Sequence, residues 1–164
     1  GLSSVTSANV DGGRLVAEFL LAGGHQRIAH IAGWQGSSTG RDRAQGFAQG
    51  LAAAGTEAVA VIDGKYDGPT AAAATRSLMT GANPPDAIFA GNDHMAFAVM
   101  DVPLAAWKSY DLTTLRQPVK RMVEATVETL LAQIDDPTRP AQKIEISGPL
   151  ILRGSARIGE GWPR

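Results

Sequence analysis

Three short apolar runs alternate with longer helical segments in the first half of the chain. The runs are Ile28–Ala32, Ala58–Ile62 and Asp86–Ala90, and each ends at a polar loop. The segments between them have the length and periodicity of helices. Strands joined through helices pair in parallel, because a tight turn cannot return the chain to the same end of a sheet. The alternation therefore predicts an α/β fold with a parallel sheet flanked by helices on both faces.

Glycine, proline and capping residues set the expected helix bounds. Asn9 and Asp11–Gly13 are interpreted as a turn and a cap, and Gly23-Gly24 ends the first helix. Pro103 does not fit a helix interior, so the α/β alternation breaks after Asp101 and no strand returns. The helices are expected at Gly13–Ala22, Ala44–Ala54 and Pro69–Met79, and then from Asn92 and from Pro118.

One long amphipathic helix dominates the second half of the chain. Its apolar stripe has the i, i+3, i+4, i+7 spacing of a single helix face. The stripe consists of Val119, Met122, Val123, Thr126, Val127, Leu130, Leu131 and Ile134. Closing strands are expected at Lys143–Ile146 and Leu150–Leu152, separated by Gly148-Pro149.

The composition excludes several classes of protein. The 164 residues suit one compact domain or one lobe of a larger protein. A net charge of -1 with scattered basic residues is not typical of a chain that holds nucleic acid by itself. The absence of cysteine excludes disulfides and cysteine-ligated metal sites. No apolar run reaches the roughly 18–20 residues that span a bilayer, and no signal segment opens the chain, so no membrane partner is expected.

The stretch Leu21–Leu51 combines a helix end, a buried strand, a Gly/Ser/Thr loop and a new helix with two arginines at its start. This order places polar ligand-binding groups at one edge of a sheet. The loop Gly33–Arg41 lacks the spacing and the lysine of a phosphate-binding P-loop. His25, His30 and His94 lack metal-ligand spacing, and no local signature of a catalytic set is present. We therefore expect a binding site without a metal, a cofactor or catalytic residues.

Six motifs are spread over nearly the whole chain. They are Val5–Gly12 (VTSANVDG), Gly24–Gly33 (GHQRIAHIAG), Arg43–Phe47 (RAQGF), Pro85–Asp93 (PDAIFAGND), Leu112–Pro118 (LTTLRQP) and Leu150–Ser155 (LILRGS). In this order they resemble the effector-binding domain of the LacI-type sugar-responsive transcription regulators. Ala8 stands where the family usually has aspartate. Each motif alone is weak evidence, whereas six in the correct order are strong evidence.

The resemblance implies a periplasmic-binding-protein-like fold over residues 1–164, with the C-terminal subdomain largely present and the other subdomain missing. It also implies a missing segment between Asp101 and Val102, where the family has the rest of a helix, a loop and a strand. The family's DNA-binding head is absent from these residues, so we expect the chain as given not to read DNA.

The resemblance also implies a function, namely the ligand-sensing domain of a DNA-binding transcription regulator. A small effector, expected to be a carbohydrate, binds in a cleft between two subdomains and allosterically controls operator binding. The implied partners are this effector, operator DNA through the absent head, and a second copy in a homodimer. The expected location is the cytoplasm, and no enzymatic activity is expected.

Arg43 is the first candidate for effector binding. A guanidinium offers a rigid fork of donors to the vicinal hydroxyls of a sugar, and in the family this arginine binds the effector. The alternative is a surface arginine at a helix start, where its charge is slightly unfavourable. Arg41 is assigned to solvent. Asn92 and Asp93 follow a strand and open a helix, where each either caps the helix or accepts hydrogen bonds from a sugar.

Aromatic and hydroxyl side chains complete the predicted site. Tyr66 lies in a polar loop after a strand, where its ring either stacks on a sugar or covers the edge of the core. Trp34 and Trp107 are assigned the same role, with packing on a neighbouring subdomain as the alternative. Thr39 lies four residues before Arg43 and is predicted to donate its hydroxyl to the same ligand.

Two other functions remain open on the sequence. A periplasmic sugar-binding protein of a transport system shares the implied fold, but it would carry a secretion signal and no DNA-binding head. The motifs LTTLRQP and LILRGS favour the regulator. An α/β enzyme is the third possibility, and it would convert its bound ligand.

Overall fold

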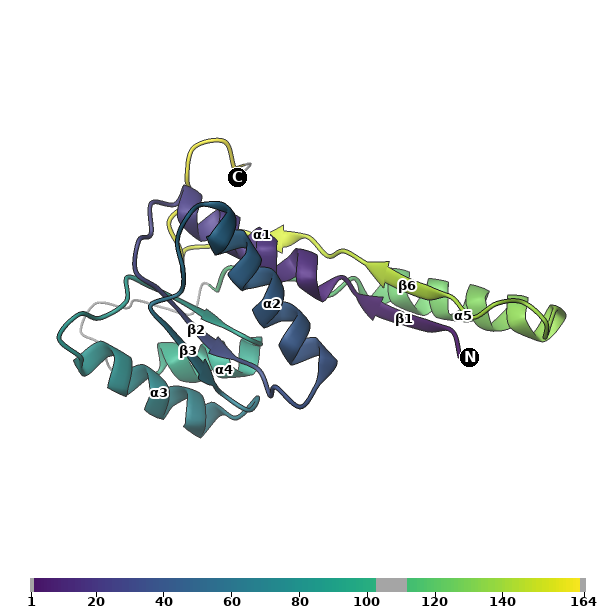
Figure 1. Ribbon diagram of the computed structural model, residues 1–164, viewed down its shortest axis with the longest axis horizontal. Helices are drawn as coiled ribbons and strands as arrows, with labels where there is room; N and C mark the ends of the chain where they lie inside the picture. The colour runs from purple at the N-terminus through teal and green to yellow at the C-terminus, as the bar shows by residue number, and fades with distance from the viewer. Residues whose placement is uncertain (1, 103–111, 163–164) are drawn as a thin grey trace.

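A three-stranded parallel sheet forms the centre of the computed structural model, which describes residues 2–102 and 112–162. The strand order is β3-β2-β4, with β2 at Ile28–Ala32, β3 at Ala60–Asp63 and β4 at Ala87–Ala90. Helices α1 (Asn9–Ala22) and α2 (Ser38–Ala53) cover one face. Helices α3 (Gly68–Thr80) and α4 (Asp93–Met100) cover the other face (Figure 1). The predicted α/β architecture is confirmed.

The central strand β2 is buried along its whole length, and its side chains alternate between two cores. Ile28 packs with Phe19 and Phe47 on the face covered by α1 and α2. Ile31 belongs to the second core, which contains Ala71, Ala74, Met95 and Val99 from α3 and α4. Both helix layers therefore pack against β2. This packing fixes the position of its carboxyl end, where the loops after β2 and β4 meet.

His30 is a core residue of this strand. Its ring stacks on Phe89 of β4 with centroids 4.6 Å apart, and its Nδ1 lies 3.0 Å from the Phe89 carbonyl oxygen. Burial lowers the pKa of His30 to about 4, because the interior disfavours the charged imidazolium. The side chain is therefore neutral at physiological pH and serves packing.

A narrow arm extends from this body (Figure 1). It consists of the parallel pair β1 (Ser4–Ser7) and β6 (Lys143–Ile146) with α5 (Val119–Asp135) beside them. The amphipathic helix is confirmed, but α5 has no buried residue. Its exposed apolar side chains are Val119, Val123, Val127, Leu130, Leu131 and Ile134. A separate antiparallel pair, β5 (Thr114–Leu115) with β7 (Leu150–Ile151), lies where the arm meets the body.

Two helix starts differ from the prediction. Helix α1 begins at Asn9, so the interpretation of Asn9 and Asp11–Gly13 as a turn is wrong. Gly13 lies inside α1, at a position where a Cβ would overlap the backbone of α2. Helix α2 begins at Ser38 instead of Ala44, because the Ser37 hydroxyl accepts a hydrogen bond from the Gly40 N–H at 3.0 Å and caps the helix earlier. Strand β3 also begins two residues later than expected.

Candidate functional site

The loops after β2, β3 and β4 meet at the carboxyl edge of the sheet. Gly33 follows β2 and Gly91 follows β4, and a Cβ added to Gly91 would lie 2.6 Å from the Gly33 nitrogen. The backbone segments that follow the two strands are therefore in direct contact. The ring of Tyr66 lies against Gly33, where a side chain on Gly33 would overlap it. Lys65 and Tyr66 have φ values of 53° and 58°, which are uncommon for residues other than glycine. This edge is therefore built from close backbone approaches and one strained turn.

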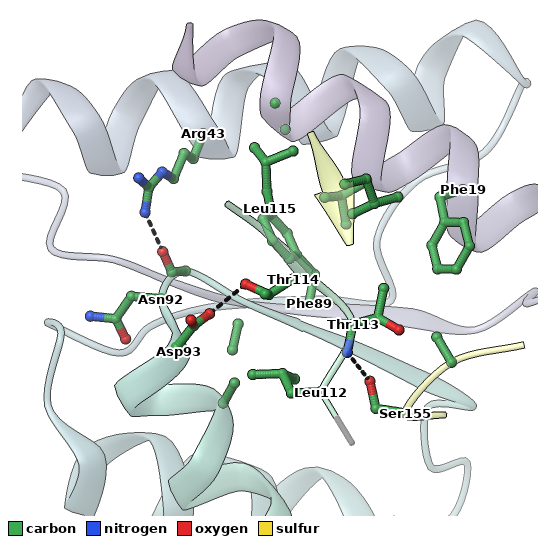
Figure 2. A pocket seen from close by; sticks show the side chains of 18 of the residues that line it. Phe19, Arg43, Phe89, Asn92, Asp93, Leu112, Thr113, Thr114, Leu115 and Ser155 are labelled. Atoms are coloured by element: carbon green, nitrogen blue, oxygen red, sulfur yellow. Dashed lines mark hydrogen bonds between the residues drawn. The ribbon is translucent and has the colours of Figure 1, made fainter. Parts of the chain in front are cut away.

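Arg43 reaches this edge from the second turn of α2. Its Nε donates to the Asn9 side-chain oxygen at 3.0 Å. Its Nη1 donates to the Gly91 carbonyl at 2.6 Å, which is the dashed line at Arg43 in Figure 2. The side chain is half-buried, and its Nη2 makes no hydrogen bond with residues 2–102 and 112–162. The hydrogen bonds of Nε and Nη1 thus fix the plane of the guanidinium, and the N–H groups of Nη2 remain available to a ligand. Arg43 was expected at the start of this helix, but α2 begins five residues earlier, at Ser38.

Asn92 and Asp93 divide the two roles that the sequence leaves open. The Asn92 side chain accepts a hydrogen bond from the Met95 N–H at 2.8 Å and is the N-cap of α4. Asp93 is exposed, and one of its carboxylate oxygens accepts a hydrogen bond from the Thr114 hydroxyl at 2.6 Å. Asn92 is therefore committed to capping, while the Asp93 carboxylate is held toward the neighbouring cavity (Figure 2).

A cavity of about 900 Å³ brings these three predicted residues together. Its polar end is lined by Arg43, Asn92 and Asp93, and Asn9 also contributes to this wall. Apolar side chains such as Phe19, Phe89 and Leu115 line much of the remainder (Figure 2). The charged or polar residues His25, Asp86, Arg116 and Arg153 line it as well. The polar end offers a guanidinium N–H as a donor and carboxylate oxygens as acceptors, which is the chemistry that a polyhydroxylated ligand requires.

Among the described residues, the predicted Tyr66, Trp34 and Thr39 lie outside the lining of this cavity. Thr39 is in the first turn of α2, and the exposed Trp34 folds over Gly36 in the preceding loop. Arg41 is exposed and donates to the Gln35 carbonyl at 3.0 Å. Trp107 falls outside the described residues.

Sequence reasoning missed two residues that hold the site in place. Asn9 orients Arg43, and Thr114 orients Asp93. Both lie in motifs that carry the family resemblance, VTSANVDG and LTTLRQP, which is the signal that points to them. Their partners are 34 and 21 positions away in the sequence, so no local pattern identifies the pairs.

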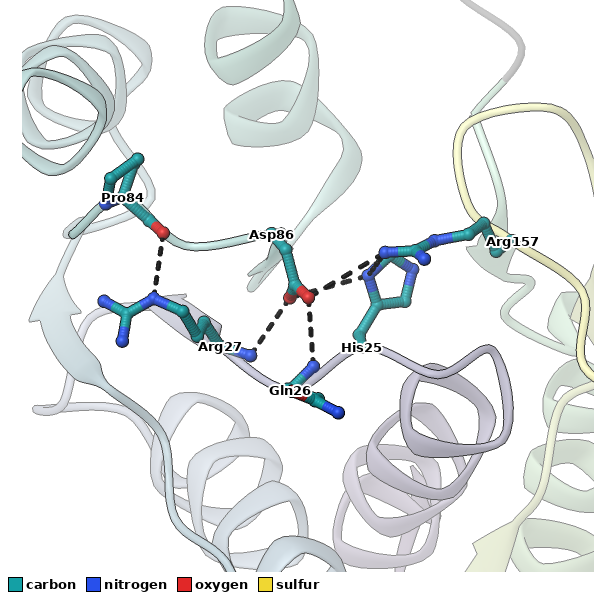
Figure 3. A network of polar contacts seen from close by, with 6 residues as sticks. All are labelled: His25, Gln26, Arg27, Pro84, Asp86 and Arg157. Atoms are coloured by element: carbon teal, nitrogen blue, oxygen red, sulfur yellow. Dashed lines mark hydrogen bonds and ion pairs between the residues drawn. The ribbon is translucent and has the colours of Figure 1, made fainter.

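A second polar cluster lies at the amino edge of the sheet, opposite the candidate site. The Asp86 carboxylate accepts hydrogen bonds from the Gln26 and Arg27 N–H groups at 3.0 and 3.1 Å, with His25 and Arg157 close by (Figure 3). Burial acts to raise the pKa of Asp86, but these donors hold it below its ordinary value. Burial, and then Arg157, lower the pKa of His25. The cluster ties the C-terminal segment to the starts of β2 and β4.

Residues 2–102 and 112–162 contain no group of three or more histidine or acidic side chains placed to hold a metal ion. None of the described helices has both the length and the apolar character needed to cross a membrane.

Comparison with known proteins assigns the chain to a family. Residues 17–107 match the model of the periplasmic binding protein-like domain, which is more than half of the chain. The ribose operon repressor of Escherichia coli (strain K12) is 29% identical over 88% of this chain and 51% of its own length. A LacI transcriptional regulator from a Rhodococcus species has a structure similar at a TM-score of 0.82, with 29% identity, over 97% of this chain and 65% of that one.

A third relative was solved with a ligand. The complex of the transcriptional regulator CelR with cellobiose matches at a TM-score of 0.81 and 29% identity, covering 93% of this chain and 53% of that one. The chain spans about half the length of the curated relatives that it matches. The chain belongs to the periplasmic binding protein-like domain family, and within it to the LacI-type regulators.

Proposed function

We propose that the protein is the ligand-sensing part of a LacI-type transcription regulator and that Arg43, Asn92 and Asp93 line the pocket of a small carbohydrate effector. The observation that carries this proposal is the fixed guanidinium of Arg43, a residue that lines the cavity and that two hydrogen bonds hold in place. The names of the relatives agree with it, since one is a ribose operon repressor and another was solved with cellobiose.

The recognition chemistry follows from donor and acceptor counting. A sugar hydroxyl both donates and accepts, so adjacent hydroxyls are satisfied together by a guanidinium N–H and a carboxylate oxygen. Arg43 supplies the donor, and Asp93 supplies the acceptor, because the Thr114 hydroxyl occupies only one of its oxygens. Asn92 contributes mainly by fixing the start of α4 and hence Asp93. Hydrogen bonds to charged groups contribute about 1.5–3 kcal/mol each.

Tyr66, Trp34, Trp107 and Thr39 belong to the outer part of the proposed site. Tyr66 supports this assignment best, because its ring lies on Gly33 at the same sheet edge as the Gly91 carbonyl that binds Arg43. Its hydroxyl is buried without a hydrogen-bond partner among the described atoms. An unpaired buried hydroxyl is costly, so a ligand oxygen that accepts from it would be stabilised.

A second subdomain would form the opposite wall of the cleft. The open apolar face of α5 supports it, because five of the side chains there are at least 55% exposed and a soluble protein rarely leaves such a stripe uncovered. The five are Val119, Val123, Leu130, Leu131 and Ile134. We assign residues 1–164 mostly to the C-terminal subdomain.

The proposed gap between Asp101 and Val102 also has support from the relatives. The match with the ribose operon repressor is 167 residues long but includes 88% of this 164-residue chain, which is about 144 residues. About 23 residues of the repressor therefore have no counterpart in this chain.

In the proposed regulator, effector binding changes the balance between two states that differ in how they place DNA-binding heads on an operator. The effector must bind the two states unequally, because a ligand with equal affinity for both shifts nothing. We further propose a homodimer in the cytoplasm, no catalysis and no cofactor. The relatives named here are repressors and regulators, which favours this function over a periplasmic transport protein or an α/β enzyme.

A thermal-shift screen of the complete gene product tests the proposal. A panel that includes ribose and cellobiose should contain at least one sugar that raises the melting temperature, because a ligand that binds only the folded state stabilises it. The gene sequence upstream of Gly1 distinguishes the regulator from the periplasmic transport protein. A helix-turn-helix encoded there would indicate the regulator, and a signal peptide would indicate the transport protein. Conversion of the bound sugar would instead identify an enzyme and reject the proposal.

A further inference from the structure

His25 belongs to a polar cluster that joins three separate segments of the chain (Figure 3). The buried His25 follows α1, Asp86 precedes β4, and Arg157 belongs to residues 153–162, which we call the strap. The Arg157 Nη2 lies 3.2 Å from the His25 Nδ1, and an Asp86 carboxylate oxygen lies 3.6 Å from the same nitrogen. Asp86 and Arg157 are the charged groups that act on His25 from the neighbouring elements.

The hydrogen bond between Arg157 and His25 forms only when the imidazole is neutral. A guanidinium donates and has no acceptor, so the His25 Nδ1 accepts with its lone pair. The proton of neutral His25 is then on Nε2, which is buried without a hydrogen-bond partner among the described residues. A second proton would occupy Nδ1 and place two cationic donors 3.2 Å apart. Protonation of His25 and its contact with Arg157 are therefore mutually exclusive.

Asp86 offers a charged imidazolium another partner. Two backbone N–H groups fix its carboxylate, which lies 3.6 Å from the His25 Nδ1 and 3.8 Å from the Arg157 Nη2. The Arg27 guanidinium is directed to the Pro84 carbonyl instead. When His25 is charged, its Nδ1 can donate to Asp86, while Arg157 loses an acceptor and gains a like-charged neighbour.

The strap has few other attachments to the body. It contains no helix or strand. Its Trp162 ring packs edge-on against Phe19 with centroids 5.2 Å apart, and its Gly159 lies so close to the Ala22 carbonyl that a Cβ would overlap it. Segments with few buried contacts open at a low cost in free energy. Loss of the Arg157 contact therefore weakens the docking of the whole strap.

The strap is also joined to the candidate site. The Ser155 hydroxyl accepts a hydrogen bond from the Thr113 N–H at 2.7 Å. The next residue, Thr114, donates its hydroxyl to the Asp93 carboxylate. Release of the strap therefore removes one support of Asp93.

We propose that the strap is a pH-sensitive switch, which neutral His25 keeps docked through Arg157 and which protonated His25 releases by pairing with Asp86. Burial, and then the charge of Arg157, lower the pKa of His25 below its ordinary 6.5. The docked form is therefore fully stabilised above pH 6.5, and this stabilisation is lost as the pH falls from 6.5 through the lowered pKa. Despite burial, its backbone donors keep the pKa of Asp86 below the ordinary 3.8, so Asp86 stays ionised in this range. The proposal does not rest on the carbohydrate function.

Fluorine NMR of the complete gene product, labelled with 5-fluorotryptophan, tests the switch without any sugar. The Trp162 resonance, assigned by its loss in Trp162→Phe, should move as the pH falls from 7 to 5, because Trp162 leaves the Phe19 ring. The exposed Trp34 provides an internal reference. Burial lowers the pKa of His30 to about 4, so His30 stays neutral over this range.

Two histidine variants isolate the titrating group. In His25→Asn an amide oxygen replaces Nδ1 as the acceptor for Arg157 but does not titrate, so the Trp162 resonance should stay at its pH 7 position. His94→Asn changes an exposed histidine of α4 and should keep the response of the parent protein. A Trp162 resonance that does not move in the parent protein, or that moves equally in His25→Asn, would overturn the proposal.

Two further measurements keep the test decisive if His25→Asn fails to fold. Arg157→Ala removes a like charge beside His25, so proton NMR should show a higher pKa of His25 than in the parent protein, and an equal pKa would reject the switch. Far-ultraviolet circular dichroism should be unchanged between pH 7 and 5. Loss of helix signal in parallel with the movement of the Trp162 resonance would assign that movement to general unfolding and also reject the switch.

Discussion

Gly13 lies where α1 crosses α2, and its substitution tests how the structure positions Arg43. A Cβ at Gly13 would overlap the Arg43 carbonyl oxygen and would lie 2.8 Å from the Phe47 nitrogen. Both neighbours are backbone atoms of α2, so they cannot rotate away. Gly13→Ala must therefore separate the two helices, which also stretches the 3.0 Å hydrogen bond between Asn9 on α1 and Arg43 on α2.

The size of the effect follows from two opposing contributions. An alanine in a helix interior is favoured over glycine by about 1 kcal/mol. Ordinary contact with the Phe47 nitrogen alone requires a separation of at least about 0.6 Å, and the Arg43 carbonyl oxygen lies closer still. Overpacking of this kind costs about 1–3 kcal/mol. Because backbone atoms on both helices resist, we expect the upper end of that range. The net loss in the free energy of unfolding is then about 2 kcal/mol, or roughly 4–8 °C in Tm.

Gly12 provides a matched control on the same helix. A Cβ at Gly12 would meet the Leu115 Cδ2 at 2.5 Å, and this flexible side chain can turn into the cavity that it lines. Urea denaturation followed by circular dichroism should therefore show Gly12→Ala within about 1 kcal/mol of the parent protein and Gly13→Ala clearly below it. A Gly13→Ala protein that is as stable as Gly12→Ala, or more so, would refute the close-packed helix crossing.

Two further predictions concern local interactions. The pKa of His30 is about 4 in the folded protein and 6.5 in the unfolded chain. Between these two pH values the unfolded state binds more protons than the folded state. The free energy of unfolding should therefore fall by about 3 kcal/mol as the pH drops from 6.5 to 4. His30→Leu should remove most of this dependence in denaturation curves measured at several pH values, and an unchanged slope would contradict the assignment. Asn92→Ala removes the cap of α4 and should lower the free energy of unfolding by about 1 kcal/mol. Asn92→Asp retains a side-chain acceptor and should lower it by less. Equal losses in the two variants would reject the capping role.

Much of the fold is predictable from the sequence because it depends on local patterns. The bounds of β4 and α3 agree with the prediction to within one residue, since Pro69 and Asn92 mark helix starts. The start of α1 was not predictable. Glycine pairs usually mark turns, whereas here Gly13 lies against the backbone of α2 and Gly12 lies against the Leu115 side chain, and no local pattern predicts these contacts.

The candidate site was predictable in its residue types but not in its support. The position of Arg43 in a recognisable motif indicated a ligand role, yet the Gly91 carbonyl and Asn9 that orient it come from distant segments. The pairing of β5 with β7 joins residues about 35 positions apart and has no signature in short strands of two residues each. The stripe on α5 was identified, but the sequence does not state what covers it.

The affinity of Arg43 variants for a carbohydrate tests the central claim most directly. Calorimetric titration of the complete gene product with the sugar that gives the largest thermal shift should be compared for Arg43→Ala and Arg41→Ala. Arg43→Ala removes one or more charge-assisted hydrogen bonds, so the account predicts a Kd raised about 10- to 150-fold. Arg41 is exposed and donates, within the described part of the chain, to the Gln35 carbonyl, so Arg41→Ala should change the Kd less than about threefold. Equal affinity of the Arg43→Ala and parent proteins would contradict the proposed effector site.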